Sequence, residues 1–221
     1  MSIEKGDIEQ ISIANVPMSE PKAMTMSTPR SKIANPAPAG IFAFAATTFL
    51  LSMYNVNTRG IHTPNVVVGM AVFTGGLLQF VAGMWEFPRG NVFGATCFSS
   101  YGTFWMSYAT ILIPSSGIIA AYTDPQELNN ALGLYLIVWM MITIIFLVVS
   151  LTKSISFILL FTVLSLALGL LAGGSFTGAA ALTKGGGIVG IITAVVAYYI
   201  GASNLLEAEV RPVMKLPLGN L

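Results

Sequence analysis

Charge is the scarcest property of this sequence. Only 9% of its 221 residues are charged, whereas soluble domains average about 25%, and this deficit excludes an ordinary water-soluble globular domain. The acidic residues gather near the two ends of the chain and in one loop with Asp124 and Glu127, which leaves Glu86 alone among apolar stretches. A net charge of +1 without a concentrated basic patch argues against a nucleic-acid partner.

Cysteine and histidine are nearly absent as well. The chain has one cysteine, Cys97, and one histidine, His62, so an internal disulfide and a Cys/His metal cluster are excluded. The Gly-x-Ser-x-Gly elbow of hydrolases is also missing, and the glycine-rich run at 185–190 lacks the Lys-Ser/Thr that completes a P-loop. We therefore expect no enzyme activity, no metal and no cofactor.

Long apolar runs are what the sequence has in abundance. Hydrophobic residues make up 55% of the chain, and they form six segments of about 20 residues, the length with which a helix crosses about 30 Å of hydrocarbon. These segments are 37–55, 66–85, 91–113, 131–151, 154–174 and 185–206. The fold class we predict is an all-α integral membrane protein with a bundle of six transmembrane helices.

The polar ends of the chain flank this membrane domain. Residues 1–34 are rich in Ser, Pro, Lys and Glu and have no apolar signal segment, so we expect a disordered cytosolic tail, followed by a membrane domain at 35–206 and a short cytosolic tail at 207–221. Basic residues near helix ends indicate orientation. One side of the predicted bundle collects Arg30, Lys32, Arg89, Lys153, Arg211 and Lys215, and the other has Arg59 and Lys184. This asymmetry predicts that both termini lie in the cytosol.

The first apolar segment carries a mixed stripe. Asn35 precedes the prolines at its start and can cap the helix. Phe44, Thr48, Leu51 and Asn55 follow at helical spacing and fall on one face. Because this face combines an aromatic ring with small polar groups, we expect it to line a path rather than to face lipid.

Carboxylates and imidazoles are missing from the middle of every predicted span, although proton-moving transporters usually carry one there. Hydroxyl groups do occur inside the spans, most densely in segment 91–113. The nearest acidic candidate is Glu86, for which a gate or proton-handling role and simple pairing with Arg89 both remain open. A path without fixed charge suits a small neutral solute or a weakly held anion.

The block Asn35-Pro36-Ala37-Pro38-Ala39-Gly40-Ile41 resembles the N-P-A-P-L-G-L signature of the acetate uptake transporter family, and differs from it at Ala39 and Ile41. This family includes bacterial succinate–acetate permeases and fungal acetate transporters, which are also described as ammonia exporters. The resemblance continues in order and spacing through the blocks 47–52, 82–86, 90–96 and 100–105.

The resemblance implies a six-helix protomer that assembles as a homohexamer, with each protomer enclosing its own pore. Relatives narrow this pore with a Phe on the first helix, a Tyr on the third and a Leu on the fifth, which correspond here to Phe44, Tyr101 and Leu164. We place Asn35, Thr48 and Glu86 at the pore mouth. The implied partners are acetate or a similar small carboxylate and the lipid bilayer.

We therefore expect a plasma-membrane permease for acetate and related short-chain monocarboxylates, with succinate as a further substrate to be considered. Transport would be coupled to a proton or would carry the neutral acid through an uncharged pore with an apolar constriction. Export of ammonia, or passage of another small neutral solute, would use the same lumen. A third reading is a membrane sensor that transports nothing, which the hydroxyl-rich N-terminal tail suggests.

Overall fold

The computed structural model describes residues 33–221, so the predicted disordered tail lies almost entirely outside the described residues. Within 33–221 the structure is helical, apart from an isolated antiparallel bridge between Ser154 and Asn220. The helices are α1 (Ala37–Asn55), η1 (Thr58–Gly60), α2 (Val67–Val72), η2 (Phe73–Leu78), α3 (Gln79–Glu86), α4 (Val92–Leu112), η3 (Pro114–Ser116), η4 (Ile119–Ala121), α5 (Pro125–Ser150), α6 (Ile155–Thr177) and α7 (Ala180–Ala208). Segment η2 is a π-helix that makes α2 and α3 continuous.

Five of these segments are long and apolar enough to cross a membrane: α1, the continuous unit Val67–Glu86, α5, α6 and α7. The remaining predicted span folds as α4, a helix of 21 residues. Its many hydroxyl-bearing residues lower its hydropathy, which explains why it is not among the five. The predicted all-helical membrane class is confirmed, while the sixth crossing stays a prediction.

Local capping explains where the observed helices extend beyond the predicted spans. Helix α5 begins at Pro125, earlier than expected, because the Asp124 side chain accepts a hydrogen bond from Gln126 N at 2.9 Å and proline fits the first helical position. Helix α6 continues to Thr177 and ends at Gly178, whose positive φ of 67° suits a glycine. The predicted loop 175–184 therefore shrinks to a short turn.

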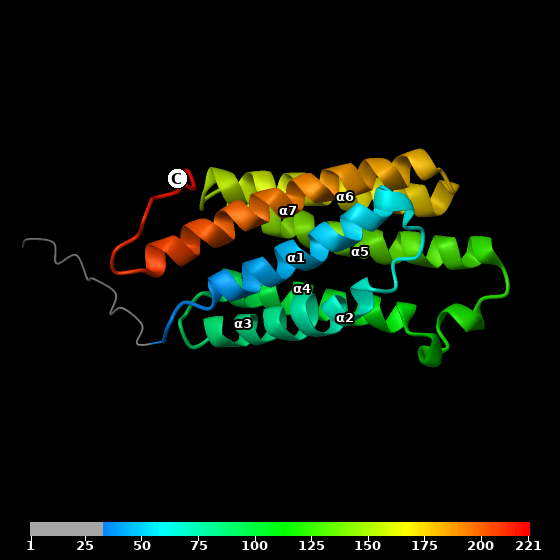
Figure 1. The fold of residues 1–221 in the computed structure, drawn as a ribbon, viewed down its shortest axis with the longest axis horizontal. Coiled ribbons are helices and arrows are strands. Elements are labelled where there is room, and N and C mark those ends of the chain that lie inside the picture. Colours follow the sequence, from blue (N-terminus) through cyan, green and yellow to red (C-terminus); the bar gives the residue numbers. More distant parts are fainter. Residues whose placement is uncertain (1–32) are drawn as a thin grey trace, which may run out of the picture. The chain divides into compact units, whose positions relative to one another are not determined.

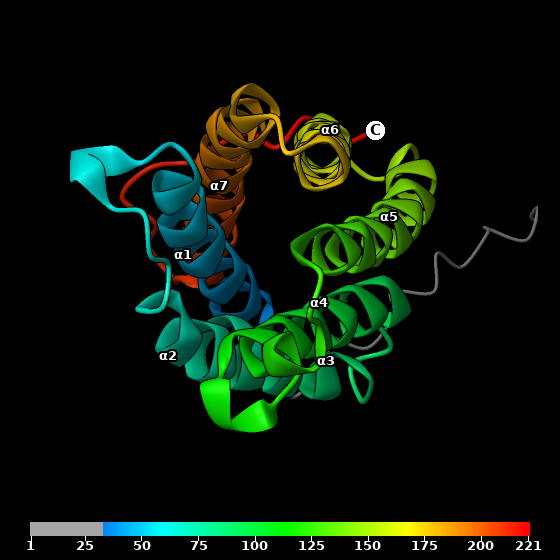
Figure 2. The same ribbon diagram turned by 90° about the vertical axis from the view of Figure 1, so that its right-hand side faces the viewer.

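The helices of residues 33–221 run up and down along one direction (Figure 1). Helix α7 packs against both α1 and α6, α5 packs against α6, and α3 packs against α4. In the end-on view the main helices surround a common centre in the order α1, α7, α6, α5 and α4, with α2 and α3 between α4 and α1 (Figure 2). Side chains from several helices consequently meet in the middle.

Glycines allow α1 and α7 to approach each other closely. A Cβ at Gly187 would lie 3.0 Å from the Ser52 backbone oxygen and 2.8 Å from Val56 Cγ1. At Gly190 it would lie 2.2 Å from Ser52 Oγ. Since lipid gives helices no hydrophobic reason to associate, such close backbone packing supplies much of the attraction between them.

The end of the chain folds back onto the bundle, although the sequence predicted only a short tail there. Three backbone N–H groups make hydrogen bonds across this contact: Ile155 to Gly219 O at 2.9 Å, Ser156 to Leu218 O at 3.1 Å and Leu221 to Lys153 O at 3.1 Å. The first two satisfy N–H groups at the start of α6 that have no partner within the helix. The turn that carries Lys153 is thereby fixed in place.

Candidate transport site

Four cavities follow one another within residues 33–221. The central cavity, of about 180 Å³, is lined by Phe44, Thr48, Tyr101 and Trp105 among others. A small cavity of about 20 Å³ adjoins it, with lining residues that include Gln79, Cys97 and Phe161. The Lys153 vestibule, of about 260 Å³, is lined by Asn35, Arg89, Asn91 and Lys153 among others. The Lys184 vestibule, of about 230 Å³, is lined by Asn57, His62, Thr183 and Lys184 among others.

Neighbouring cavities share lining residues, and this sharing fixes their order. Asn55 and Thr183 line both the Lys184 vestibule and the central cavity. Phe44 and Tyr101 line both the central and the small cavity. Cys97, Phe98 and Phe157 line both the small cavity and the Lys153 vestibule. The four cavities therefore form one row from one end of the bundle to the other.

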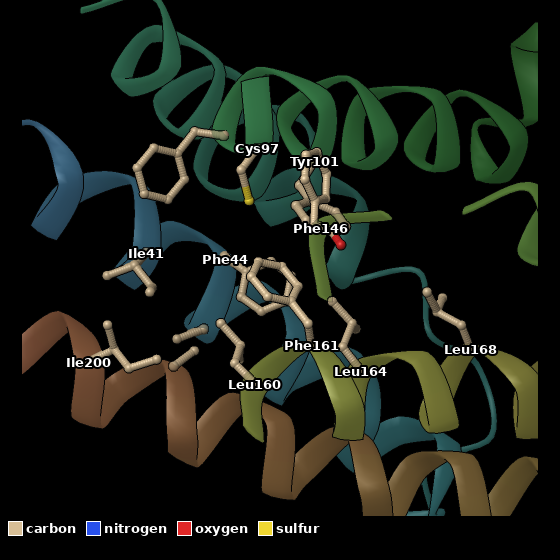
Figure 3. Packing of buried hydrophobic residues seen from close by; sticks show 13 residues of the cluster. Ile41, Phe44, Cys97, Tyr101, Phe146, Leu160, Phe161, Leu164, Leu168 and Ile200 are labelled. Carbon is tan, nitrogen blue, oxygen red and sulfur yellow. The ribbon is translucent and has the colours of Figure 1, made fainter. Parts of the chain in front are cut away.

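Phe44 and Tyr101 line both inner cavities and Leu164 lines the central one; we refer to these three residues as the neck. Their exposed fractions are 5%, 4% and 7%, and the ring centroids of Phe44 and Tyr101 are 5.4 Å apart. Figure 3 shows these side chains converging from α1, α4 and α6, together with Phe146 and Phe161. The three residues that the sequence assigned to one constriction thus belong to one buried cluster.

The hydroxyl of Tyr101 is engaged within the protein. It lies 2.8 Å from Thr143 Oγ1, and the Thr143 hydroxyl donates to Trp139 O at 2.7 Å. A threonine hydroxyl has only one hydrogen, so the Tyr101 O–H is the donor to Thr143. With its hydroxyl engaged in this way, Tyr101 borders the two inner cavities through its ring.

Two other polar groups of the central cavity have no protein partner. Thr48 Oγ1 and Trp105 Nε1 are buried and make no hydrogen bond within the protein. Their residues are only 7% and 2% exposed. Thr48 lies one helical turn after Phe44, and Trp105 lies one turn after Tyr101. An unsatisfied buried polar group is costly, and these two groups are unpaired donors on residues that line the central cavity.

The stripe predicted on the first helix lines the cavity as expected. Phe44, Thr48, Leu51 and Asn55 all border the central cavity. Thr48, which the sequence placed at the mouth, lies inside this cavity beside the neck. The helical spacing of these residues was therefore sufficient to predict one wall of the central cavity.

Asn35 and Glu86, which the sequence placed at the pore mouth, both accept hydrogen bonds from Arg89. Asn35 Oδ1 accepts a hydrogen bond from Ala37 N at 3.1 Å, as the capping prediction requires, and also from the Arg89 guanidinium. Glu86 is fully buried, and its Oε2 accepts from Arg89 at 3.2 Å. Asn35 lines the Lys153 vestibule, whereas Glu86 is not among the lining residues of these four cavities.

Sequence reasoning did not assign roles at the site to Trp105, Thr143 or Lys153. Trp105 follows Tyr101 by one turn within the block 100–105, so its spacing was an available signal. Thr143 is a lone hydroxyl in an apolar run, a pattern that usually means bonding to its own helix. Lys153 served only as an indicator of orientation. A π-helical segment also escaped prediction, and it places Gly75 where a Cβ would lie 2.8 Å from Trp105 Cδ1.

A chain with several membrane-length helices around a row of cavities is a multi-pass membrane protein. Residues 18–218 match the model of the GPR1/FUN34/yaaH family, and the chain belongs to this family. The family resemblance found in the sequence is thereby confirmed.

Several proteins similar to this chain carry transport names, although the relative with 48% identity, accumulation of dyads protein 2 of Saccharomyces cerevisiae, does not. Ammonia transport outward protein 2 of Saccharomyces cerevisiae is 46% identical over 190 residues, which cover 86% of this chain and 67% of that protein. Acetate permease A of Emericella nidulans is 39% identical over 201 residues, covering 84% and 67%. The solved structure of the bacterial acetate channel SatP is 33% identical, with a TM-score of 0.74 and coverage of 84% of this chain and 100% of that one. These are names of transporters and channels rather than of enzymes.

Proposed function

We propose that this chain conducts acetate and similar short monocarboxylates across the membrane along its row of cavities. The observation that carries the proposal is the position of Phe44 and Tyr101, which lie between two cavities and line both. A solute that moves along the row has to pass these rings. The names of the acetate permease and the acetate channel support acetate as the solute.

The neck suits a small weak acid. Apolar rings offer nothing to replace the water around a charged solute. A weak acid therefore passes most easily in its neutral form or together with a proton. The small cavity of about 20 Å³ beyond the neck has room for roughly one water molecule. Proton coupling, or passage as the neutral acid, is therefore part of this proposal.

The central cavity supplies hydrogen-bond donors for a carboxylate. The indole N–H of Trp105 can only donate, and the Thr48 hydroxyl can donate as well. Both are without a protein partner. A carboxylate that accepts from both would satisfy two buried groups at once, while its methyl group would face Phe44 and the aromatic wall of Phe104 and Trp139.

The membrane arrangement we propose has six crossings, with α4 as the sixth, whose aromatic residues Tyr101, Phe104, Trp105 and Tyr108 line the central cavity. Both termini would lie on the cytosolic side of the plasma membrane, as the distribution of basic residues favours. Each subunit of a homohexamer would contain its own path. This assembly is supported by the family resemblance.

A second candidate function is the export of ammonia, which the name of the relative with 46% identity favours. Neutral ammonia is small enough for the same neck and carries no charge. A membrane sensor without transport is the third candidate.

Uptake by the purified full-length chain in liposomes separates the three. We expect uptake of labelled acetate above that of protein-free liposomes, reduced by unlabelled acetate and unaffected by ammonium. Competition by ammonium, with ammonia flux exceeding acetate flux, would favour export of ammonia. Absence of any flux would contradict transport of both solutes and favour the sensor.

A further inference from the structure

The Lys153 vestibule contains the charged groups that the neck lacks. Arg89 and Lys153 line it together with the amide side chains of Asn35, Asn91 and Asn204. No Asp or Glu among the described residues lines this vestibule or the other three cavities. At the opposite end the Lys184 vestibule contains Lys184 and His62. Fixed charge along the described row is therefore basic.

Lys153 carries the uncompensated charge of its vestibule. Arg89 forms the one ion pair found within residues 33–221, at 3.2 Å from the buried Glu86, so these two charges largely cancel. Lys153 Nζ instead lies 4.6 Å from the centre of the Phe93 ring. This contact holds the ammonium group over the cavity wall without neutralising it.

Helix direction adds to the positive potential. The vestibule is lined by residues from the first turns of three helices, namely Ala37 of α1, Gly94 of α4 and Phe157 of α6. The side chains of Asn91 and Ser154 already accept hydrogen bonds from the starts of α4 and α6. These helices thus contribute the positive ends of their dipoles rather than free donors.

We propose that the Lys153 vestibule is a collecting site for carboxylate anions, in which the Lys153 ammonium raises the local concentration of the anion and repels ammonium. The inference rests on the proposed function and identifies its substrate class, because the same charge that attracts acetate disfavours a cationic solute. The three amide side chains provide donors for a carboxylate that retains most of its water. The anion would then be delivered to the neck beside Cys97.

The alternative role for Lys153 is structural, because its backbone oxygen accepts from Leu221 N at 3.1 Å and its side chain covers Phe93. The electrostatic role requires the charge of Lys153, whereas the structural role does not, so substitutions that keep or remove the charge distinguish them. Lys153→Arg keeps the charge and the contact with the ring, whereas Lys153→Gln keeps much of the side-chain length and removes the charge. Lys215→Gln removes a charge from an exposed residue that lines none of the four cavities.

Initial rates of acetate uptake are measured in liposomes as a function of acetate concentration and ionic strength for the full-length chain and these variants. We expect Lys153→Gln to raise KM about fivefold, as one unit charge at close range in water predicts, with little change in kcat. The variant should also lose most of the decrease in uptake that salt causes, since screening acts on this charge. Lys153→Arg and Lys215→Gln should resemble the unchanged protein.

The inference is overturned if Lys153→Gln matches the unchanged protein in KM and in its response to salt, or if Lys153→Arg is as impaired as Lys153→Gln. In either case the proposed function would stand, provided that substitution of Phe44 still alters selectivity. If the unchanged protein moves no acetate, the proposed function itself fails and this inference fails with it.

Discussion

In the proposed path Phe44 would set the width of the neck, because its ring lies next to that of Tyr101 and both line the two inner cavities. Phe44→Ala removes that ring, so acids larger than acetate should pass. We expect the rate of lactate uptake relative to acetate to rise about tenfold, the usual effect of small changes in an apolar pocket. Liposome uptake of both labelled acids measures this ratio.

Phe49→Ala is the matched control for the Phe44 substitution. Phe49 is on the same helix and contacts Tyr198 with ring centroids 6.5 Å apart, but it lines none of the four cavities. Removal of a buried phenyl ring costs about 3 kcal/mol of stability, so the milder Phe44→Leu variant is tested as well. If the Phe44 and Phe49 variants have the same ratio of lactate to acetate uptake, Phe44 does not determine which acids pass.

Trp105→Phe tests the donor in the central cavity. The substitution keeps an aromatic ring and deletes the indole N–H, which has no protein partner. A hydrogen bond to a charged group contributes about 1.5 kcal/mol or more, so KM for acetate should rise about tenfold. Stability should fall by less than the lost ring volume alone predicts, because an unsatisfied buried group is removed with it. Uptake kinetics and thermal unfolding measure the two effects.

Trp85→Phe is the control for Trp105→Phe, since Trp85 is 54% exposed on α3. Its uptake kinetics should match those of the unchanged protein. An unchanged KM for acetate in Trp105→Phe would show that the indole N–H does not bond the solute.

Sequence alone reached part of this site and missed the rest for a physical reason. The spacing of Phe44, Thr48, Leu51 and Asn55 depends only on helix geometry, so the wall of the cavity was predictable. The pairing of the Tyr101 hydroxyl depends on how α4 meets α5, and no local pattern encodes it. The same holds for the indole N–H of Trp105. Whether it has a hydrogen-bond partner depends on the packing of neighbouring helices and not on its sequence context.

At the scale of elements, apolar length determined the helices and capping determined their ends. The first predicted span, 37–55, agrees with α1 at both ends, because a proline pair and a polar loop bound it. The prediction was shorter than α5 and α7 because it followed hydropathy, whereas Asp124 and the turn at Gly178 determine where these helices start. The π-helix in Phe73–Leu78 has no comparable signature.

Gly187→Ala tests the contact between α1 and α7. The added methyl would lie 3.0 Å from a backbone oxygen of α1, which cannot rotate away. Overpacking of this kind costs about 1–3 kcal/mol, so the unfolding temperature in detergent should fall by several degrees, and acetate uptake should weaken because α1 carries Phe44. Thermal unfolding and uptake are measured on the same preparation.

Gly185→Ala provides the contrast on the same helix. Its added methyl would meet only Leu170 Cδ1, at an ordinary 3.8 Å, and alanine favours a helix over glycine by up to about 1 kcal/mol. The unfolding temperature should stay the same or rise. If both alanine variants are equally stable, close packing at Gly187 does not hold α1 to α7.

At the scale of the described bundle, the direction of the helices separates two kinds of chemistry. Helices α1, α4 and α6 start at the Lys153 vestibule, and their middle turns supply Phe44, Tyr101 and Leu164 to the neck. Charge is thus confined to the ends of the row and apolar rings to its centre. Under the proposed function, a row with this arrangement would collect a polar solute and then require it to shed water.

Cys97 allows this arrangement to be tested in the unmodified sequence. It is the single cysteine of the chain, and it lines the small cavity and the Lys153 vestibule on one side of the neck. A membrane-impermeant anionic thiol reagent applied from the Lys153 end of uniformly oriented vesicles should label Cys97 and block acetate flux. From the Lys184 end the neck should prevent labelling, which mass spectrometry of the protein measures.

The neck is then opened by substitution. In Phe44→Ala the same reagent should reach Cys97 from the Lys184 end as well, since the ring that closes the row is gone, whereas Phe49→Ala should keep the labelling one-sided. Cys97→Ser should be insensitive from either end. Labelling of the unchanged protein from both ends at equal rates would mean that Phe44 and Tyr101 form no barrier.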